Sequence, residues 1–181
     1  IDLYGADTAR WFMLSDSPPE RDLQWTNTGI AASFKFINKL YDLVDKYKNY
    51  TETKLNDPNI KETLKTLVNQ VSENIEAFQF NKSVAKIYEF VNIVNDSLTK
   101  NNISKIDLKW SLNKLSIILQ PFIPHISEEI WYCLGNKTLC INERWVDEDV
   151  KKKIRVKIAV QINGKTRAVI EIDQNVTKEK L

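Results

Sequence analysis

The sequence predicts a mainly α-helical protein, an antiparallel helical bundle with a C-terminal β-hairpin. Two observations lead to this prediction. Between residues 28 and 134, apolar side chains recur at intervals of three and four, the spacing of one face of an α-helix. From Ile154 onward the interval changes to two, the spacing of a strand. The 181 residues, 43% of them hydrophobic, suffice for one domain with a small appendage.

Composition and charge exclude several classes of protein. The 26 basic and 24 acidic residues nearly cancel, so nucleic-acid binding would require a local basic patch. Two cysteines and one histidine form neither a disulfide framework nor a zinc ligand set, so we expect reduced thiols and no metal site. There is no apolar run of about eighteen residues and no leader after Ile1. We therefore expect a monomeric, cytoplasmic protein that does not contact the membrane.

A short helix is expected over residues 7–14. Asp7 is expected to accept hydrogen bonds from the free amides of this helix's own first turn. Apolar side chains surround the helix, a pattern typical of a helix covered on more than one side. Pro18 and Pro19 end it, because proline lacks an amide hydrogen and restricts the residue before it.

A long helix follows from Thr28 to about Tyr47, after an extended segment that ends at Trp25. Thr26 or Thr28 is expected to cap it. Its apolar stripe is predicted to consist of Ile30, Phe34, Ile37, Tyr41 and Val44. Lysines lie mostly off that stripe, where a solvated face is the simplest interpretation: Lys35, Lys39, Lys46 and Lys48.

Three further helices are predicted from their start signals and stripes. Asp57 with Pro58 starts one, and Asn81 is expected to cap the next. Ser104 and Asp107 have the spacing of a capping box for the third. The inward stripes are Ile60, Leu64, Leu67, Val71 and Ile75; Val84, Ile87, Val91, Val94 and Leu98; and Leu108, Leu112, Leu115 and Leu119.

The last helix of the bundle begins at a corner fixed by Pro121 and Pro124 and ends at Gly135. Glu128 and Glu129 are adjacent, about 100° apart on a helix, so they do not form a converging catalytic pair. We interpret them as helix-dipole and salt-bridge residues. His125 has no nucleophile or second histidine to complete a catalytic site, so we assign it a structural role.

The hairpin prediction includes its register. A two-residue Asn163-Gly164 turn would place the apolar sets of the two strands on opposite faces. We therefore predict a three-residue loop, Ile162 to Gly164, with a bulge at Gly164. The predicted pairs are Val160 with Thr166, Ile158 with Ala168, and Val156 with Ile170.

Two motifs resemble those of a known family. The short apolar helix, Ser-Pro-Pro-Glu, Trp25 and the capped long helix resemble the segment after the catalytic domain of class I aminoacyl-tRNA synthetases, most closely the leucyl-tRNA synthetases. Pro-x-x-Pro-His-x-x-Glu-Glu-x-Trp from Pro121 resembles the last bundle helix of the leucyl, isoleucyl, valyl and methionyl enzymes. In addition to these two motifs, a third stretch, Val-Gln-Ile-Asn-Gly-Lys-Thr-Arg from Val160, is similar to the start of the leucyl enzymes' C-terminal domain.

The resemblance implies a tRNA-binding piece of an enzyme that attaches leucine to its tRNA with ATP. The family's catalytic signatures, His-Ile-Gly-His and Lys-Met-Ser-Lys-Ser, do not occur, so no catalytic residue is assigned. No cofactor is expected here; ATP and magnesium are implied for the whole enzyme. The implied partners are leucine tRNA and the missing catalytic domain. The expected divisions are a segment over 1–27 that connects the missing catalytic domain to the bundle, the anticodon-binding bundle over 28–145, a linker over 146–153 and a truncated C-terminal domain over 154–181.

Candidate tRNA-binding residues are cations on the expected surface: Arg21, Lys35, Lys39, Lys165 and Arg167. Lys165 and Arg167 follow the Asn-Gly turn and can reach phosphates, although an ordinary charged edge strand explains them equally well. Because leucyl enzymes generally do not rely on the anticodon, the resemblance implies contacts to RNA backbone and shape. The five tryptophans are interpreted as residues of the core or of the connecting segment, although exposed tryptophans can stack on bases.

Two other interpretations remain open at this point. The chain is alternatively the equivalent piece of a valyl- or isoleucyl-tRNA synthetase, which the sequence upstream of Ile1 would distinguish. It is alternatively a helical protein-interaction module without RNA binding. A continuous basic stripe on the surface would favour RNA, whereas an apolar groove would favour a peptide partner.

Overall fold

The computed structural model describes residues 2–16, 18, 20–51, 59–146, 155–162 and 165–173; in the last two ranges the description is of the backbone. The chain divides into two compact units, Ile1–Glu148 and Asp149–Leu181. The first unit holds six α-helices and one 3₁₀ helix among its described residues, and the second holds two strands. Among the described helices, none is long and apolar enough to cross a membrane.

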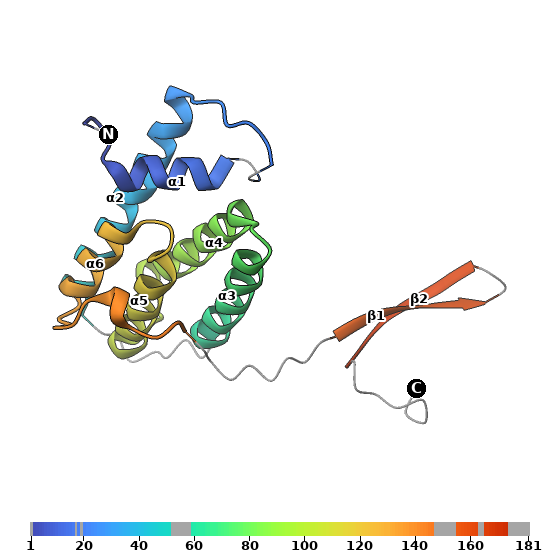
Figure 1. Cartoon of the computed structure of the whole chain (residues 1–181). Helices are drawn as coiled ribbons and strands as arrows, with labels where there is room; N and C mark the ends of the chain where they lie inside the picture. Colours follow the sequence, from blue (N-terminus) through green and yellow to red (C-terminus); the bar gives the residue numbers. More distant parts are fainter. Residues whose placement is uncertain are drawn as a thin grey trace. The chain divides into compact units, whose positions relative to one another are not determined.

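The first unit is a helical bundle, as predicted (Figure 1). Helix α1 lies across one end of the bundle, where it contacts α2, α4 and α6. Helix α3 packs on α4 and α5, and α6 packs on α5 and α2. The helices are α1 (Ala6–Asp16), α2 (Asn27–Asn49), α3 (Asn59–Glu76), α4 (Phe80–Thr99), α5 (Lys105–Leu119) and α6 (Pro124–Cys133), with the 3₁₀ helix η1 (Cys140–Asn142) after them.

Three of the predicted helix ends are confirmed by their local geometry. The Thr26 hydroxyl caps α2 by accepting from Gly29 N at 3.1 Å. The Ser104 hydroxyl caps α5 by accepting from Asp107 N at 3.0 Å. Gly135 follows α6 with φ of +87°, a left-handed conformation that glycine adopts without steric cost.

The prediction that Asn81 caps α4 is wrong. This helix already begins at Phe80, with Gln79 at the cap position and no capping bond from the Gln79 side chain. Phe80 packs edge-on against Phe122, so a tertiary contact favours a start one residue earlier than the polar signal. Asp57 and Pro58, the predicted start of α3, lie outside the described residues.

The core is continuous through the bundle and includes α1. Trp11 is fully buried, and its ring stacks on Phe36 with centroids 4.6 Å apart. Its indole nitrogen donates to the Tyr88 hydroxyl at 3.1 Å, so the polar end of the ring is also satisfied. The stripe from Leu108 to Leu119 is buried, as predicted.

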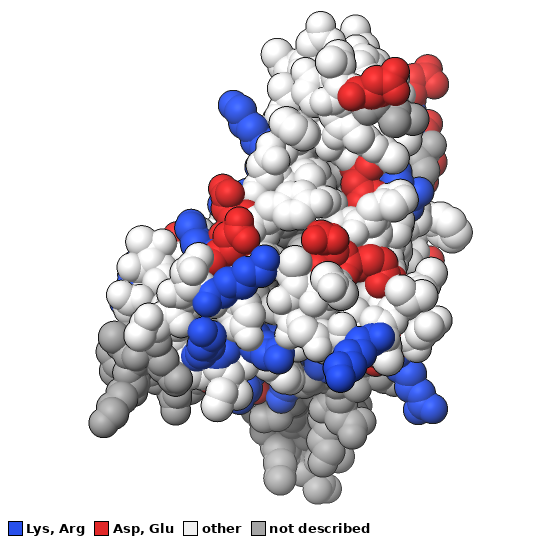
Figure 2. Space-filling view, turned by 90° about the vertical axis from the view of Figure 1, so that its left-hand side faces the viewer, with Lys and Arg blue, Asp and Glu red and all other residues white. Residues whose placement is uncertain are grey.

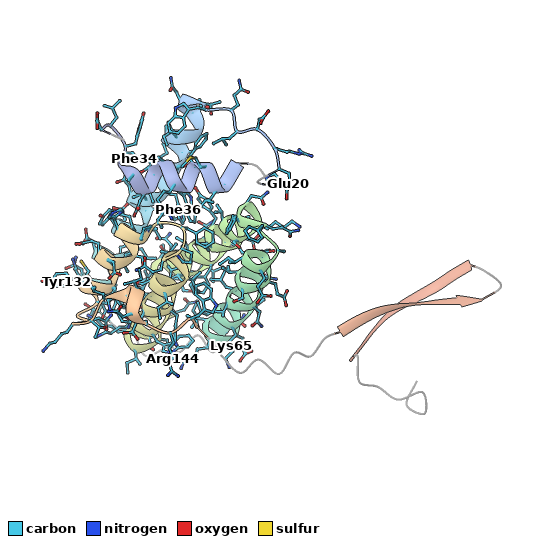
Figure 3. All side chains as sticks on the ribbon, viewed as in Figure 1. Glu20, Phe34, Phe36, Lys65, Tyr132 and Arg144 are labelled. Carbon is cyan, nitrogen blue, oxygen red and sulfur yellow. The ribbon has the colours of Figure 1, made fainter. Side chains whose placement is uncertain are left out.

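The predicted stripe of α2 is only partly correct. Ile30, Ile37 and Val44 are buried, but Tyr41 is 41% exposed. The missed members of the buried face are Ser33, Phe36, Leu40 and Leu43. Figure 3 shows Phe36 directed into the bundle beneath α1 and Phe34 beside the start of α1. Because α2 contacts α1, α4, α5 and α6, its buried face is wider than the single stripe that the periodicity identified.

Gly29 allows α1 and α2 to approach closely. A Cβ atom built at this position would lie well inside van der Waals contact with the Phe12 ring and 2.8 Å from the Thr26 hydroxyl. Any larger residue would therefore have to displace Phe12 or the cap of α2. This explains why the segment that joins the two helices requires glycine in the first turn of α2.

The second unit contains the antiparallel strands β1 (Arg155–Ile162) and β2 (Lys165–Asp173). The predicted three-residue loop is wrong, because Ile162 pairs with Lys165 and Gln161 with Thr166. The register then shifts between Val160 and Gln161, and the apolar partners become Val160 with Ala168, Ile158 with Ile170 and Val156 with Ile172. The extra residue is thus placed within β2, not at the turn.

Candidate nucleic-acid interface and the joint that supports it

Asp7 connects the first helix to the last one. Its side chain is buried; Oδ1 lies 2.8 Å from Nδ1 of His125, and Oδ2 accepts from the backbone amide of Ile126 at 2.7 Å. Our prediction that Asp7 caps its own helix is therefore wrong, because it caps the first turn of α6. Pro124 occupies the first position of α6, and the Ile126 amide in the same first turn has no partner within the helix, so a carboxylate there is favoured by hydrogen bonding and by the helix dipole.

Arg10 makes the second connection between these segments. Its Nε donates to the carbonyl of Phe122 at 2.8 Å, and its Nη2 donates to the carbonyl of Pro121 at 2.9 Å. These carbonyls lie in the corner between α5 and α6. Arg10 was not among the predicted functional residues, and the available signal was the corner itself, whose carbonyls need donors. We call Asp7, Arg10 and residues 121–126 the joint.

His125 lies at the start of α6, as predicted, and its side chain is 77% exposed. Its contact with Asp7 supports the structural interpretation of this histidine. The two motifs on which the family resemblance rests therefore bind each other through Asp7 and Arg10, although they are more than a hundred positions apart in sequence.

Glu128 and Glu129 have different surroundings, consistent with the view that they do not converge. The Glu128 carboxylate accepts from the amides of Cys140 at 2.7 Å and Ile141 at 2.9 Å, so it fixes the start of η1. Glu129 instead accepts from the Cys133 thiol on its own helix. Glu128 therefore caps a neighbouring turn, a role that its position in α6 alone did not reveal.

Four of the five tryptophans lie in the core or pack against it, as predicted: Trp11, Trp110, Trp131 and Trp145. Trp131 is buried, and Trp110 and Trp145 pack against the core while remaining partly exposed. Trp145 is docked on the bundle through a 2.8 Å hydrogen bond to the Ser72 hydroxyl. Trp25 differs from these: it is 54% exposed and touches Phe12 edge-on, so it belongs to the connecting segment over residues 1–27 and not to the core.

The free thiols are Cys133, which is partly exposed, and Cys140, which is buried. Burial raises the pKa of both, and Lys48 opposes the rise at Cys133. Both are therefore protonated near neutral pH, and neither has the lowered pKa of a reactive cysteine.

The five predicted tRNA-binding residues divide between the two units. Arg21 and Lys35 are exposed, and Lys39 is partly buried on α2. Lys165 and Arg167 lie on β2, where Lys165 pairs with Ile162 and Arg167 is the extra residue of the register shift. On the face seen in Figure 2, Lys and Arg gather in the lower part below a band of Asp and Glu, so the near-neutral chain has an uneven surface.

Lysines of the bundle have two kinds of partner. Four of them form ion pairs with carboxylates: Lys48 with Asp45, Lys61 with Asp107, Lys65 with Glu62 and Lys86 with Glu89. Others bond neutral oxygens instead: Lys39 Nζ donates to Oδ1 of Asn92, and Lys46 Nζ donates to Oδ1 of Asn95 at 2.7 Å. Lys105 Nζ donates to the carbonyl of Tyr50 at 3.0 Å. The charge of a lysine that bonds a neutral oxygen is not offset by that partner.

Comparisons with known proteins identify a family model and several relatives that are similar to this chain. The model of the family described as "Anticodon-binding domain of tRNA ligase" matches residues 57–181. The chain is 37% identical to a leucine–tRNA ligase of Rickettsia bellii, over 98% of this chain and 22% of the relative. It is 38% identical to that of Paramagnetospirillum magneticum, over 97% of this chain and 21% of the relative. The chain thus spans about a fifth of the length of these relatives.

A solved structure is similar over almost the whole chain. It is the ternary complex of agnB2 LeuRS from Agrobacterium radiobacter K84 with tRNA and LeuAMS. The two share 26% sequence identity with a TM-score of 0.71, covering 97% of this chain and 24% of that one. The resemblance to leucyl-tRNA synthetases inferred from the two motifs is confirmed by these relatives. The chain belongs to the family of anticodon-binding domains of tRNA ligases.

Proposed function

We propose that the chain is the tRNA-binding part of a leucine–tRNA ligase, an enzyme that joins leucine to its tRNA with ATP. The observation that carries this proposal is similarity along 97–98% of the chain to leucine–tRNA ligases and to a LeuRS solved with tRNA. The two strands of the second unit would be the start of the enzyme's C-terminal domain.

The chemistry of the reaction would take place outside this chain. In the part of the chain that the structure describes, no group of three or more His, Cys, Asp or Glu side chains that could hold a metal ion comes together. No step of adenylation or transfer is assigned to the described residues. Their role would be to hold the RNA through its backbone while another part of the protein acts on its end.

The outer face of α1 would pack against the remaining part of the longer protein. Leu3, Met13 and Trp25 lie on or beside this helix and are about half to mostly exposed. Single exposed apolar residues are ordinary, and a further domain would cover these three side chains. The joint would then fix this face relative to the bundle.

Binding of leucine tRNA at several salt concentrations tests the function. If about three of the predicted cations meet phosphates, the slope of log affinity against log salt should be roughly −2 to −3. Replacing Lys165 and Arg167 together with alanine should flatten the slope by about one unit for each phosphate contact that is lost. Affinity that ignores salt would contradict the proposal and favour a protein-interaction module.

A further inference from the structure

A row of lysines on α2 lies beside two asparagines of α4. Lys35, Lys39 and Lys46 are separated by four and seven residues, so they share one face of the helix. Lys39 and Lys46 bond the side-chain oxygens of Asn92 and Asn95, which are three residues apart on α4. We call these five residues the seam.

The neutral partners determine what the seam can bind. A lysine paired with a carboxylate has little charge left for a ligand, as with Lys65 and Glu62 on α3. An asparagine oxygen accepts one hydrogen bond and leaves the charge of the lysine intact. Lys39 and Lys46 are thus held in place, which lowers the entropic cost of binding an anion, without being neutralised.

The dimensions of the seam suit a nucleic-acid strand. Seven residues of α-helix separate Lys39 from Lys46, a distance of about 10 Å along the axis. One strand of B-DNA carries a phosphate about every 3.4 Å along the helix axis, so the separation of the two lysines is on the scale of a few successive phosphates of a nucleic-acid strand. Because lysine acts as a point charge, such contacts follow phosphates and carry no sequence information.

We propose that the seam is a phosphate-binding track for the backbone of the bound tRNA, and that Asn92 and Asn95 hold Lys39 and Lys46 in position without neutralising them. This inference rests on the proposed function, because it specifies where the RNA lies on the bundle. It adds Lys46, Asn92 and Asn95 to the predicted residues Lys35 and Lys39.

One acidic residue lies on the same face of α2. Asp42 is exposed, three positions after Lys39 and four before Lys46, and it forms no ion pair with either lysine in the described structure. It lowers the positive potential of the seam without replacing the asparagine contacts. Its removal should therefore strengthen RNA binding.

The test replaces Asn92 and Asn95 together with aspartate. The change preserves the shape of both side chains and turns each hydrogen bond into an ion pair, so the thermal midpoint of unfolding should not fall. A labelled leucine tRNA transcript should bind about five- to tenfold more weakly, and the salt slope should shrink by about one unit for each neutralised lysine. The double variant Lys39→Gln with Lys46→Gln should have the same effect.

Matched controls separate the seam from net charge. Asn69→Asp with Asn74→Asp adds the same two negative charges on α3, which packs on α4 and α5. Lys65→Gln with Lys86→Gln removes two lysines that are paired with carboxylates. Both controls should change the affinity less than twofold. Asp42→Asn should raise it about two- to threefold, a gain that a misfolded variant cannot produce.

The outcomes distinguish the seam from the proposed function. If wild-type protein binds tRNA with the expected salt dependence but the seam variants bind equally well, the seam is wrong and the function stands. Equal weakening in the seam variants and the α3 controls overturns the seam in favour of a diffuse charge effect. A wild-type protein that does not bind tRNA contradicts both.

Discussion

The joint and the seam both hold charged side chains by hydrogen bonds, but the partners of those charges differ. In the joint, the charged groups of Asp7 and Arg10 bond backbone atoms of the corner and the first turn of α6, and one of them is buried. In the seam, Lys39 and Lys46 bond neutral amide oxygens near the surface and form no ion pair in the described structure. A charge that satisfies buried backbone stabilises the fold, whereas a charge held by a neutral partner remains available to a ligand.

The largest effect on folding is expected at the joint. Replacing Asp7 with alanine would leave the amide of Ile126 buried without its carboxylate and would remove the contact with His125. The free energy of unfolding should fall by about 2–3 kcal/mol, because a buried donor loses a charged acceptor. Urea unfolding followed by circular dichroism measures this change. A loss below about 0.5 kcal/mol would show that the joint does not hold α1 to α6.

Arg10 should have a smaller effect than Asp7. Replacing it with methionine keeps an apolar stem but removes both donors to the carbonyls of Pro121 and Phe122. We expect a loss of about 1–2 kcal/mol, because these carbonyls are partly exposed and water can replace one donor. Replacing Arg10 with lysine should restore part of the stability, since one of the two bonds can still form.

Asp107 and Lys61 form an ion pair at the start of α5, and its effect on the free energy of unfolding should be smaller than that of the joint and larger than that of the seam. Hydrogen bonds from Lys61 and Ser104 and the charge of Lys61 lower the pKa of Asp107, against a rise from burial. A lowered pKa in the folded state means that the stabilisation is present above the unfolded pKa and is lost as pH falls through the folded pKa.

Replacing Asp107 with asparagine should therefore cost about 0.5–1 kcal/mol at pH 7, and the difference from wild type should shrink as pH falls below the unfolded pKa of Asp107 and be lost below its folded pKa. Urea unfolding at a series of acidic pH values measures it. A difference that stays constant over the series would assign the effect to helix capping alone.

The smallest effect on folding is expected from the seam. Replacing Lys39 and Lys46 with glutamine should change the free energy of unfolding by less than about 0.5 kcal/mol, because both side chains lie near the surface and bond neutral groups. The same urea titration checks this. A loss comparable to that of the Asp7 variant would make the seam a structural element and would weaken the distinction from the joint.

What the sequence could predict depended on how far apart the interacting residues are. Thr26, Ser104 and Gly135 were identified correctly because each helix end is decided within about four residues. Asp7 and Arg10 were not, because their partners lie 111 to 119 positions away. Nothing near Asp7 in the sequence distinguishes a carboxylate that caps its own helix from one that caps another.

The register of the strands and the partners of the lysines also could not be predicted from residues nearby in the sequence. The expectation of matched apolar pairs in β1 and β2 was sound, but the position of the extra residue was not specified by the alternation, and it falls at Arg167. Lys39 was predicted as a candidate from the resemblance. Its asparagine partner could not be, because the pairing depends on how α2 and α4 lie against each other.

Measuring both stability and tRNA affinity for one variant of each region tests most directly whether the joint serves folding and the seam serves binding. The free energy of unfolding and the affinity for leucine tRNA are measured together for the Asp7→Ala variant and for the Asn92→Asp, Asn95→Asp variant, under conditions in which both are folded. We predict a loss of about 2–3 kcal/mol in stability with little change in affinity for the first. For the second we predict unchanged stability and about five- to tenfold weaker binding. Parallel losses of stability and affinity in both variants would contradict the separation of the two regions.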